Sequence, residues 1–273
     1  MTTAESILLG TIQGITEFLP VSSSGHLLLA EHFMGTKDAG LAYDVMLHMG
    51  TLLAVLAYFR SDWLEMARGL FPRRGSGEKK GPGSKRLLLF IIIGTIPGAA
   101  IGYFCEHFVA STLRSPWVVV CTLAGVALLL AAAERFAHHR RGFERLGMKD
   151  ALTIGLAQAA AIVPGVSRSG ITMTAGLFLG LSREAAARFS FLLSAPIIAG
   201  AGLYEGLKLV KQGTQEIPPA YLWGFGASAI SGYLVIAFLM NYLRRHTFYP
   251  FAAYRLILAA AVAMLLIAGG QKW

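Results

Sequence analysis

A short polar cluster occurs twice in this chain, 145 residues apart, and both copies lie inside apolar sequence. The first copy is VSSSGH at residues 21–26, and the second is VSRSGI at residues 166–171. The same offset pairs Gln13 with Gln158. Hydroxyl-rich backbone broken by glycine is costly inside a bilayer unless it lines a cavity. The duplication therefore predicts an internal repeat whose two halves build one polar site.

The composition places the chain in a membrane. It is 55% hydrophobic and 14% charged, with a mean hydropathy of +0.58, whereas a soluble protein carries roughly a quarter charged residues. The apolar runs are continuous rather than alternating, which predicts a polytopic α-helical protein and not a β-barrel. The formal charge of +9 comes from basic residues in short loops. Cytoplasmic orientation and anionic lipid explain them, so we expect membrane lipids and no nucleic acid as partners.

The apolar pattern predicts one integral membrane domain, residues 1–273, that is all-α. Each half holds a broken, short helical pair followed by three spans, with the halves at about 1–134 and 150–273. The broken pairs cover 5–35 and 150–181, the second interrupted at Pro164-Gly165 and again over 167–170. We interpret the first as a re-entrant hairpin, the alternative being one broken span. The six spans are expected at 43–60, 87–104, 117–134, 188–208, 220–240 and 251–270.

Charge predicts how the helices cross the membrane. The loops 60–86 and 135–149 are rich in Lys and Arg, which favours the cytoplasm for both and places both termini outside. Three spans per half is an odd number, so the halves must be inverted relative to each other. The hairpins then enter from opposite faces and their serine turns meet near the middle, as in inverted-repeat transporters.

The polar residues of the two turns suit phosphate chemistry together. Gln13 and Glu17 share one helix face because they are four residues apart. The turn residues that we expect at the same site are Ser22, Ser23, Ser24 and His26 from the first copy, and Ser167, Arg168, Ser169 and Thr172 from the second. Helix N-termini and hydroxyls bind anions, and arginine adds a planar fork for phosphate oxygens. A carboxylate can hold a divalent cation or act as a base, histidine can move a proton, and a hydroxyl beside a base can be a nucleophile. This set predicts phosphoryl transfer.

Simpler interpretations apply to single residues. Serines at a helix start are commonly N-caps, and a lone Glu17 can be a helix–helix hydrogen bond. Arg168 at a hairpin tip needs an anionic partner, either Glu17 or a bound phosphate. Arg255, near the start of the last span, is expected to snorkel to the cytoplasmic side, and Asp44 is expected to pair with His48.

Two long motifs resemble a known family. Residues 13–26, QGITEFLPVSSSGH, and residues 164–172, PGVSRSGIT, are similar to the two signatures of undecaprenyl-diphosphate phosphatases, the bacitracin-resistance membrane phosphatases. Their order, their spacing and the chain length also fit, so the resemblance covers essentially the whole chain.

The resemblance implies hydrolysis of undecaprenyl diphosphate to the monophosphate lipid carrier used in peptidoglycan synthesis. It implies a divalent cation, Mg²⁺ or Ca²⁺, and a site in the bacterial inner membrane that opens to the periplasmic face. By position, Glu17 matches the essential acidic residue, His26 the essential histidine, Arg168 the phosphate-binding arginine and Ser23 the proposed nucleophile. The first signature position is Glu or Gln in the family and is Gln13 here, so no carboxylate pair is available there to chelate a metal.

The resulting hypothesis has Arg168 and the turn serines Ser22, Ser24, Ser167 and Ser169, with Thr172, holding the diphosphate. Glu17 and Gln13 position a metal, His26 transfers a proton, and either Ser23 or a water attacks. The rival hypothesis is a transporter or flippase of a phosphorylated polyprenyl lipid, because the repeat pattern is typical of transporters. A purely structural scaffold leaves Arg168 unexplained. The sequence gives no oligomeric state, and a homodimer stays open.

Overall fold

The computed structural model describes residues 1–34, 40–70, 83–113, 115–211 and 218–268, and within them every regular element is a helix. This confirms the all-α prediction. The helices are α1 (Thr3–Phe18), α2 (Ser23–Met34), α3 (Leu41–Tyr58), α4 (Arg60–Leu70), α5 (Ser84–Thr112), α6 (Pro116–Phe136), η1 (Phe143–Arg145), α7 (Met148–Ala159), η2 (Ala160–Ile162), α8 (Arg168–Phe178), α9 (Arg183–Lys211), α10 (Pro219–Tyr242) and α11 (Tyr249–Ala268). Parts of the predicted elements lie outside the described ranges: residue 35, residues 71–82 of the basic loop 60–86, and residues 269–270.

Both predicted breaks are present, and they share one backbone conformation. A proline, which has no N–H, follows α1 at position 20 and η2 at position 164. Ser22 (φ 78°), two residues after Pro20, and Ser167 (φ 69°), three residues after Pro164, adopt the left-handed conformation that non-glycine residues rarely hold. These two serines are equivalent in the 145-residue repeat, and each directly precedes the next helix. The repeat in the sequence is therefore also a repeat of an unusual turn.

The break in the second pair is shorter than predicted. The expected second interruption over residues 167–170 is wrong, because α8 already begins at Arg168. The Ser167 side chain accepts a hydrogen bond from the Gly170 amide at 3.1 Å, so this serine is the N-cap of α8. Residues 168–170 form the first turn of the helix instead of breaking it.

Five of the six predicted spans appear as single long helices. Among the described residues, α5, α6, α9, α10 and α11 are long and apolar enough to cross a bilayer. The span expected at 43–60 differs, because α3 reaches that standard only together with α4, and the two helices are bent by 74°. The chain is therefore a multi-pass membrane protein, and its described residues contain five candidate spans, or six if the bent pair counts as one.

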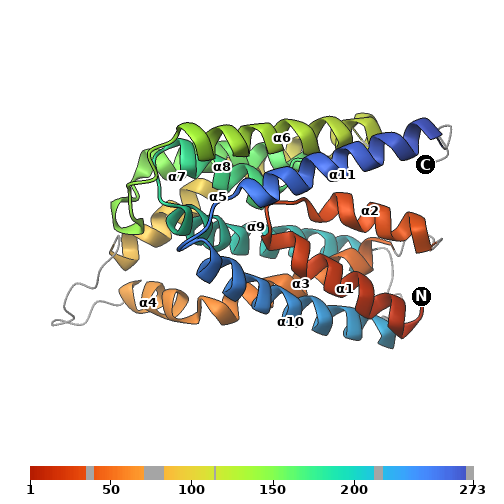
Figure 1. The fold of residues 1–273 in the computed structure, drawn as a ribbon. Coiled ribbons are helices and arrows are strands. Elements are labelled where there is room, and N and C mark those ends of the chain that lie inside the picture. The colour runs from red at the N-terminus through yellow and green to blue at the C-terminus, as the bar shows by residue number, and fades with distance from the viewer. Residues whose placement is uncertain (35–39, 71–82, 114, 212–217, 269–273) are drawn as a thin grey trace.

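The helices pack around α9, whose most apolar stretch is the most buried of the five candidate spans. α1 packs against α10, α10 against α3, and α6 against α11 (Figure 1). α1 begins and α11 ends at the same end of the bundle, and α4 lies at the other end (Figure 1). The ends of helices that meet near α4 carry four ion pairs, Arg141–Asp150, Arg183–Glu134, Arg188–Asp62 and Arg244–Glu184. The hydrogen bonds that Arg141 donates to the Asp150 carboxylate raise the pKa of Arg141, so that arginine stays charged.

Two glycines that are equivalent in the repeat let the backbones of neighbouring helices approach closely. A Cβ at Gly10 would lie 2.2 Å from the carbonyl oxygen of Gly224 on α10, and a Cβ at Gly155 would lie 2.3 Å from that of Gly94 on α5. Small residues at such crossings let membrane helices approach closely. The repeat therefore extends from the turns into the packing of α1 and α7.

We expect Gly10→Ala and Gly155→Ala each to lower the free energy of unfolding by about 1–3 kcal/mol, because backbone atoms must move to admit the methyl group. Gly226→Ala is the matched control, since Gly226 lies on α10 and a Cβ there meets no atom within 4 Å. That substitution should be neutral or stabilising because alanine is the better helix former. Thermal unfolding in detergent measures all three, and equal melting temperatures would contradict the close-contact interpretation.

Candidate active site

The two turns meet in the interior of the bundle, as the sequence predicted. The Ser169 hydroxyl donates to the carbonyl of Leu19 at 2.9 Å, and the Gly165 amide donates to the Ser24 hydroxyl at 3.4 Å. Each contact joins one copy of the polar cluster to the other across at least 141 residues of sequence. The composite site predicted from the duplication is therefore formed by direct hydrogen bonds between the copies.

Arg255 ties the turns together from α11. Its side chain is fully buried, and it donates five hydrogen bonds of 3.0–3.3 Å to backbone carbonyls. The acceptors are Pro20 in the first turn, Gly165 and Val166 in the second, and Thr122 and Leu123 on α6. The prediction that Arg255 snorkels to the membrane surface is wrong. Carbonyls freed by the two turns provide the acceptors that let this guanidinium stay in the interior.

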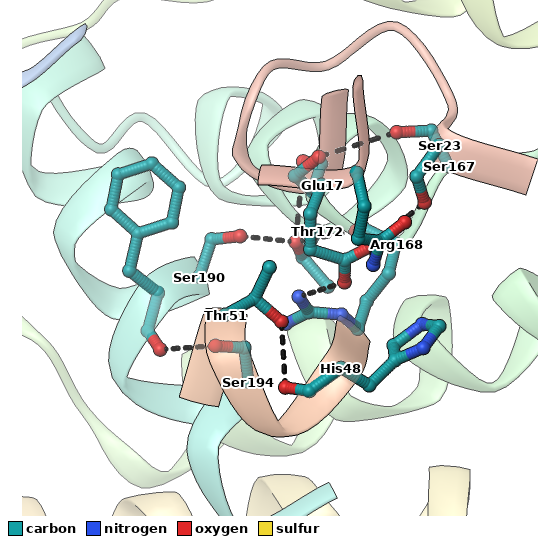
Figure 2. A network of polar contacts seen from close by, with 12 residues as sticks. Glu17, Ser23, His48, Thr51, Ser167, Arg168, Thr172, Ser190 and Ser194 are labelled. Atoms are coloured by element: carbon teal, nitrogen blue, oxygen red, sulfur yellow. Dashed lines mark hydrogen bonds and ion pairs between the residues drawn. The ribbon is translucent and has the colours of Figure 1, made fainter. Parts of the chain in front are cut away.

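An ion pair between Glu17 and Arg168 forms the centre of the site (Figure 2). The Arg168 guanidinium donates to Glu17 Oε1 at 2.7 Å, and the side chains are 14% and 7% exposed. Glu17 was one of two partners predicted for Arg168, and the structure shows this pair. A pair this buried is stable only when its remaining oxygens are also hydrogen-bonded.

Two further side chains satisfy the second oxygen of Glu17. The Ser23 hydroxyl donates to Oε2 at 2.7 Å, and the Gln13 amide nitrogen donates to it at 3.2 Å. The helix spacing that placed Gln13 and Glu17 on one face is thus confirmed. A serine hydroxyl bonded to a carboxylate, beside an arginine, is the arrangement of a nucleophile with its base and an anion receptor.

The other predicted phosphate-binding hydroxyls mainly hold the turns in place. The Ser22 and Ser24 hydroxyls are 3.2 Å apart, as are those of Ser167 and Ser169. Thr172 donates to its own helix and lies 2.7 Å from the Ser190 hydroxyl of α9, where it is buried (Figure 2). The capping interpretation is therefore correct for Ser167, and Thr172 contacts α9 and not the Glu17 oxygens.

His26 lies in the first turn of α2, as predicted, and its two ring nitrogens have other partners. Nδ1 lies 2.7 Å from the carbonyl oxygen of Ser22, and Nε2 lies 2.6 Å from the Tyr254 hydroxyl on α11. The group hydrogen-bonded to the Ser23 hydroxyl is Glu17. The Ser23 hydroxyl is therefore bonded to Glu17, whereas the two ring nitrogens of His26 contact the Ser22 carbonyl and the Tyr254 hydroxyl.

Comparison with known proteins agrees with this geometry. The family model described as bacitracin resistance protein BacA matches residues 6–261. A protein named undecaprenyl-diphosphatase from Rubrobacter xylanophilus is 49% identical over 266 residues, covering 96% of this chain and 98% of its own. Proteins of the same name from Hahella chejuensis and Pelotomaculum thermopropionicum are 45% and 43% identical, covering 97% and 98% of this chain and 99% and 98% of their own.

This chain belongs to the BacA family. The match extends over essentially the full length of the chain, so it includes both motifs and the helices between them.

Sequence reasoning missed the residues that this BacA-family protein places around the motifs. Tyr254 was not considered, and Arg255 was assigned to the membrane surface. Figure 2 also shows His48 and Thr51 of α3 beside the Glu17–Arg168 pair. His48 Nδ1 lies 2.8 Å from the Asp44 backbone carbonyl. An arginine inside an apolar span was the available signal for Arg255, because such residues are costly unless they have partners.

The oxygens present fit a divalent cation only in part. Gln13 Oε1 is buried without a hydrogen-bond partner, and Glu17 supplies the neighbouring carboxylate. Among the described residues, no three His, Cys, Asp or Glu side chains gather as metal ligands. Mg²⁺ commonly takes one or two carboxylates and completes its shell with substrate phosphates and water. Gln13 and Glu17 therefore suit an ion that is bound together with a diphosphate.

Proposed function

We propose that this protein hydrolyses undecaprenyl diphosphate to undecaprenyl phosphate and inorganic phosphate. The reaction recycles the lipid carrier for peptidoglycan synthesis and confers bacitracin resistance. One observation supports it most strongly: the Ser23 hydroxyl is bonded to Glu17, which is paired with Arg168 from the other turn. Membership of a family whose relatives are named undecaprenyl-diphosphatase supports the substrate.

The residues suggest how the reaction proceeds. The lipid tail stays among the apolar helices, and the terminal phosphate takes the guanidinium of Arg168 and the amides at the start of α2 and α8. Ser23 Oγ attacks the terminal phosphorus while Glu17 takes its proton, and the bond to the bridging oxygen breaks to release undecaprenyl phosphate. Water then hydrolyses the phosphoserine, with His26 taking the proton of that water. In the variant hypothesis, water attacks directly and Ser23 only orients Glu17.

A divalent cation, Mg²⁺ or Ca²⁺, is part of the proposal. Glu17 and Gln13 Oε1 would hold it, and it would offset negative charge on the diphosphate. Arg168 pairs with Glu17 and balances its negative charge, so we propose that the cation arrives together with the diphosphate.

We further propose a six-span inverted repeat in the bacterial inner membrane, with α1–α2 and α7–α8 as re-entrant hairpins. The domain comprises residues 1–273, with halves at about 1–134 and 150–273. The shared turn conformation at Ser22 and Ser167 supports the repeat. The ion-paired end of the bundle would face the cytoplasm, so that both termini and the mouth of the active site face the periplasm. A homodimer is part of this proposal, and its molecular mass in detergent tests it.

Phosphate release from a C55 isoprenyl diphosphate by the purified protein tests the function. We expect release that stops with chelator and returns with Mg²⁺ or Ca²⁺. Glu17→Gln should reduce kcat by about a hundredfold or more, because the amide removes the base and the charged ligand while keeping the shape. A folded wild-type protein that binds labelled lipid but releases no phosphate would overturn hydrolysis and favour the transporter or flippase.

Ser23→Ala separates the two forms of attack. If Ser23 is the nucleophile, the variant should lose activity and rapid quenching of the wild type should trap phosphoserine at position 23. Full activity in Ser23→Ala would assign the attack to water. Ser231→Ala is the control, because that hydroxyl donates to a carbonyl of its own helix, α10.

A further inference from the structure

The imidazole of His26 is held at both nitrogens. Nδ1 lies 2.7 Å from the Ser22 carbonyl oxygen, which can only accept, so Nδ1 must carry the hydrogen. In the neutral ring Nε2 is then an acceptor, and its partner is the Tyr254 hydroxyl at 2.6 Å. The contacts thus determine the tautomer and make Nε2, whose lone pair accepts the Tyr254 O–H, the basic nitrogen of the ring.

Tyr254 also fixes the plane of the ring. The two rings are stacked with centroids 5.6 Å apart and an angle of 7° between their planes. Stacking and the hydrogen bond together restrict rotation of the imidazole about its Cβ–Cγ bond. A freely rotating His26 would present Nε2 in the required direction only part of the time, which lowers the rate of proton transfer.

The next residue along the chain holds Tyr254 itself in place. Arg255 donates to the carbonyls of both turns, including Pro20, which lies two residues before Ser22. The same short segment of α11 therefore holds the backbone on which His26 sits and the ring that His26 contacts. Tyr254 is 43% exposed, so its position depends on these contacts and not on burial.

We propose that Tyr254 positions His26 and links it to the attacking water: it keeps the Nδ1–H tautomer in one orientation, and its hydroxyl passes its hydrogen to Nε2 while it takes the proton of that water. The inference rests on the proposed function, in which His26 takes a proton during phosphate hydrolysis. It adds α11 to the two turns as a third contributor to the reaction.

Tyr254→Phe tests the proposal because it retains the stacked ring and removes only the hydroxyl. We expect kcat to fall about tenfold, the change that corresponds to one lost hydrogen bond, with KM nearly unchanged. Tyr249→Phe is the matched control on the same helix, and its kcat should equal that of the wild type. In a His26→Gln background, Tyr254→Phe should cause no further loss, because a residue that acts through His26 has no effect without it.

A spectroscopic measurement makes the result independent of catalysis. In protein labelled with ¹⁵N-histidine, the His26 signals are assigned by their loss in His26→Gln. Tyr254→Phe should shift the Nε2 signal of His26, whereas Tyr249→Phe should not. An unchanged Nε2 signal, or wild-type kcat in Tyr254→Phe, would overturn the positioning role. Absence of phosphate release by the wild type would instead overturn the proposed function, and the ¹⁵N measurement would still decide the contact.

Discussion

Arg168→Lys is expected to lower kcat/KM for phosphate release by about 10²–10³-fold, although the positive charge is retained. The guanidinium of Arg168 is a planar fork that bonds Glu17 at 2.7 Å and is suited to phosphate oxygens in two directions. Lysine offers a compact charge, which cannot form a bidentate contact with a phosphate. Loss of one oriented donor in such a site lowers the rate by a factor of this size. Steady-state kinetics with the isoprenyl diphosphate measures the effect.

Lysine is the informative replacement because alanine would confuse two effects. Removing the whole side chain leaves Glu17 buried and unpaired, which destabilises proteins by about 3–5 kcal/mol. Arg183→Lys is the control, since Arg183 pairs with the buried Glu134 at the end of the bundle near α4. That variant should keep wild-type activity. Near-normal activity in a folded Arg168→Lys protein would show that charge alone suffices and that the fork has no role.

Arg255→Ala is expected to destabilise the protein strongly. It removes five hydrogen bonds and leaves buried carbonyls in both turns without a donor. Each unsatisfied carbonyl costs about 1–3 kcal/mol, so the total should reach at least about 3 kcal/mol. For a chain of this size, that corresponds to a melting temperature lower by roughly 5–10 °C.

Thermal unfolding in detergent checks this prediction, with Arg245→Ala as the control because Arg245 is exposed between α10 and α11. Arg255→Lys should recover only part of the loss, since an ammonium group has three hydrogens for carbonyls that lie around a planar guanidinium. A few tenths of a kcal/mol shift the melting temperature by only about 1 °C. If the melting temperature of Arg255→Ala lies that close to the wild-type value, the five hydrogen bonds contribute little to the free energy of unfolding.

The centre of the site could be predicted because its residues are unusual where they occur. Glu17 and Arg168 are ionisable groups inside apolar sequence, so each required a partner, and the 145-residue repeat indicated that the partners come from the two turns. The same reasoning predicted the breaks that begin at Pro20 and Pro164. Polar residues are rare in these apolar segments, so each one indicated where the site lies.

The remainder depended on geometry that the sequence does not contain. Arg255 near a span end is compatible with snorkelling or with burial, and only the rotation of α11 about its axis decides between them. Tyr254 is an ordinary residue near a membrane surface, so nothing marked it as a partner of His26. The hydroxyl of Thr172 was assigned to phosphate from its spacing, whereas packing against α9 directs it to Ser190.

The hydrogen bonds that Arg255 donates to both turns also limit how the two halves can move. A carrier with two structural repeats exposes its site alternately by rocking one repeat against the other. Here one rigid side chain bonds Pro20 in the first half and Gly165 in the second at the same time. Any rocking motion would have to break those buried hydrogen bonds in every cycle. Arg255 therefore holds the two turns in one fixed arrangement. This suits a site at which the lipid arrives, reacts and leaves by the same opening.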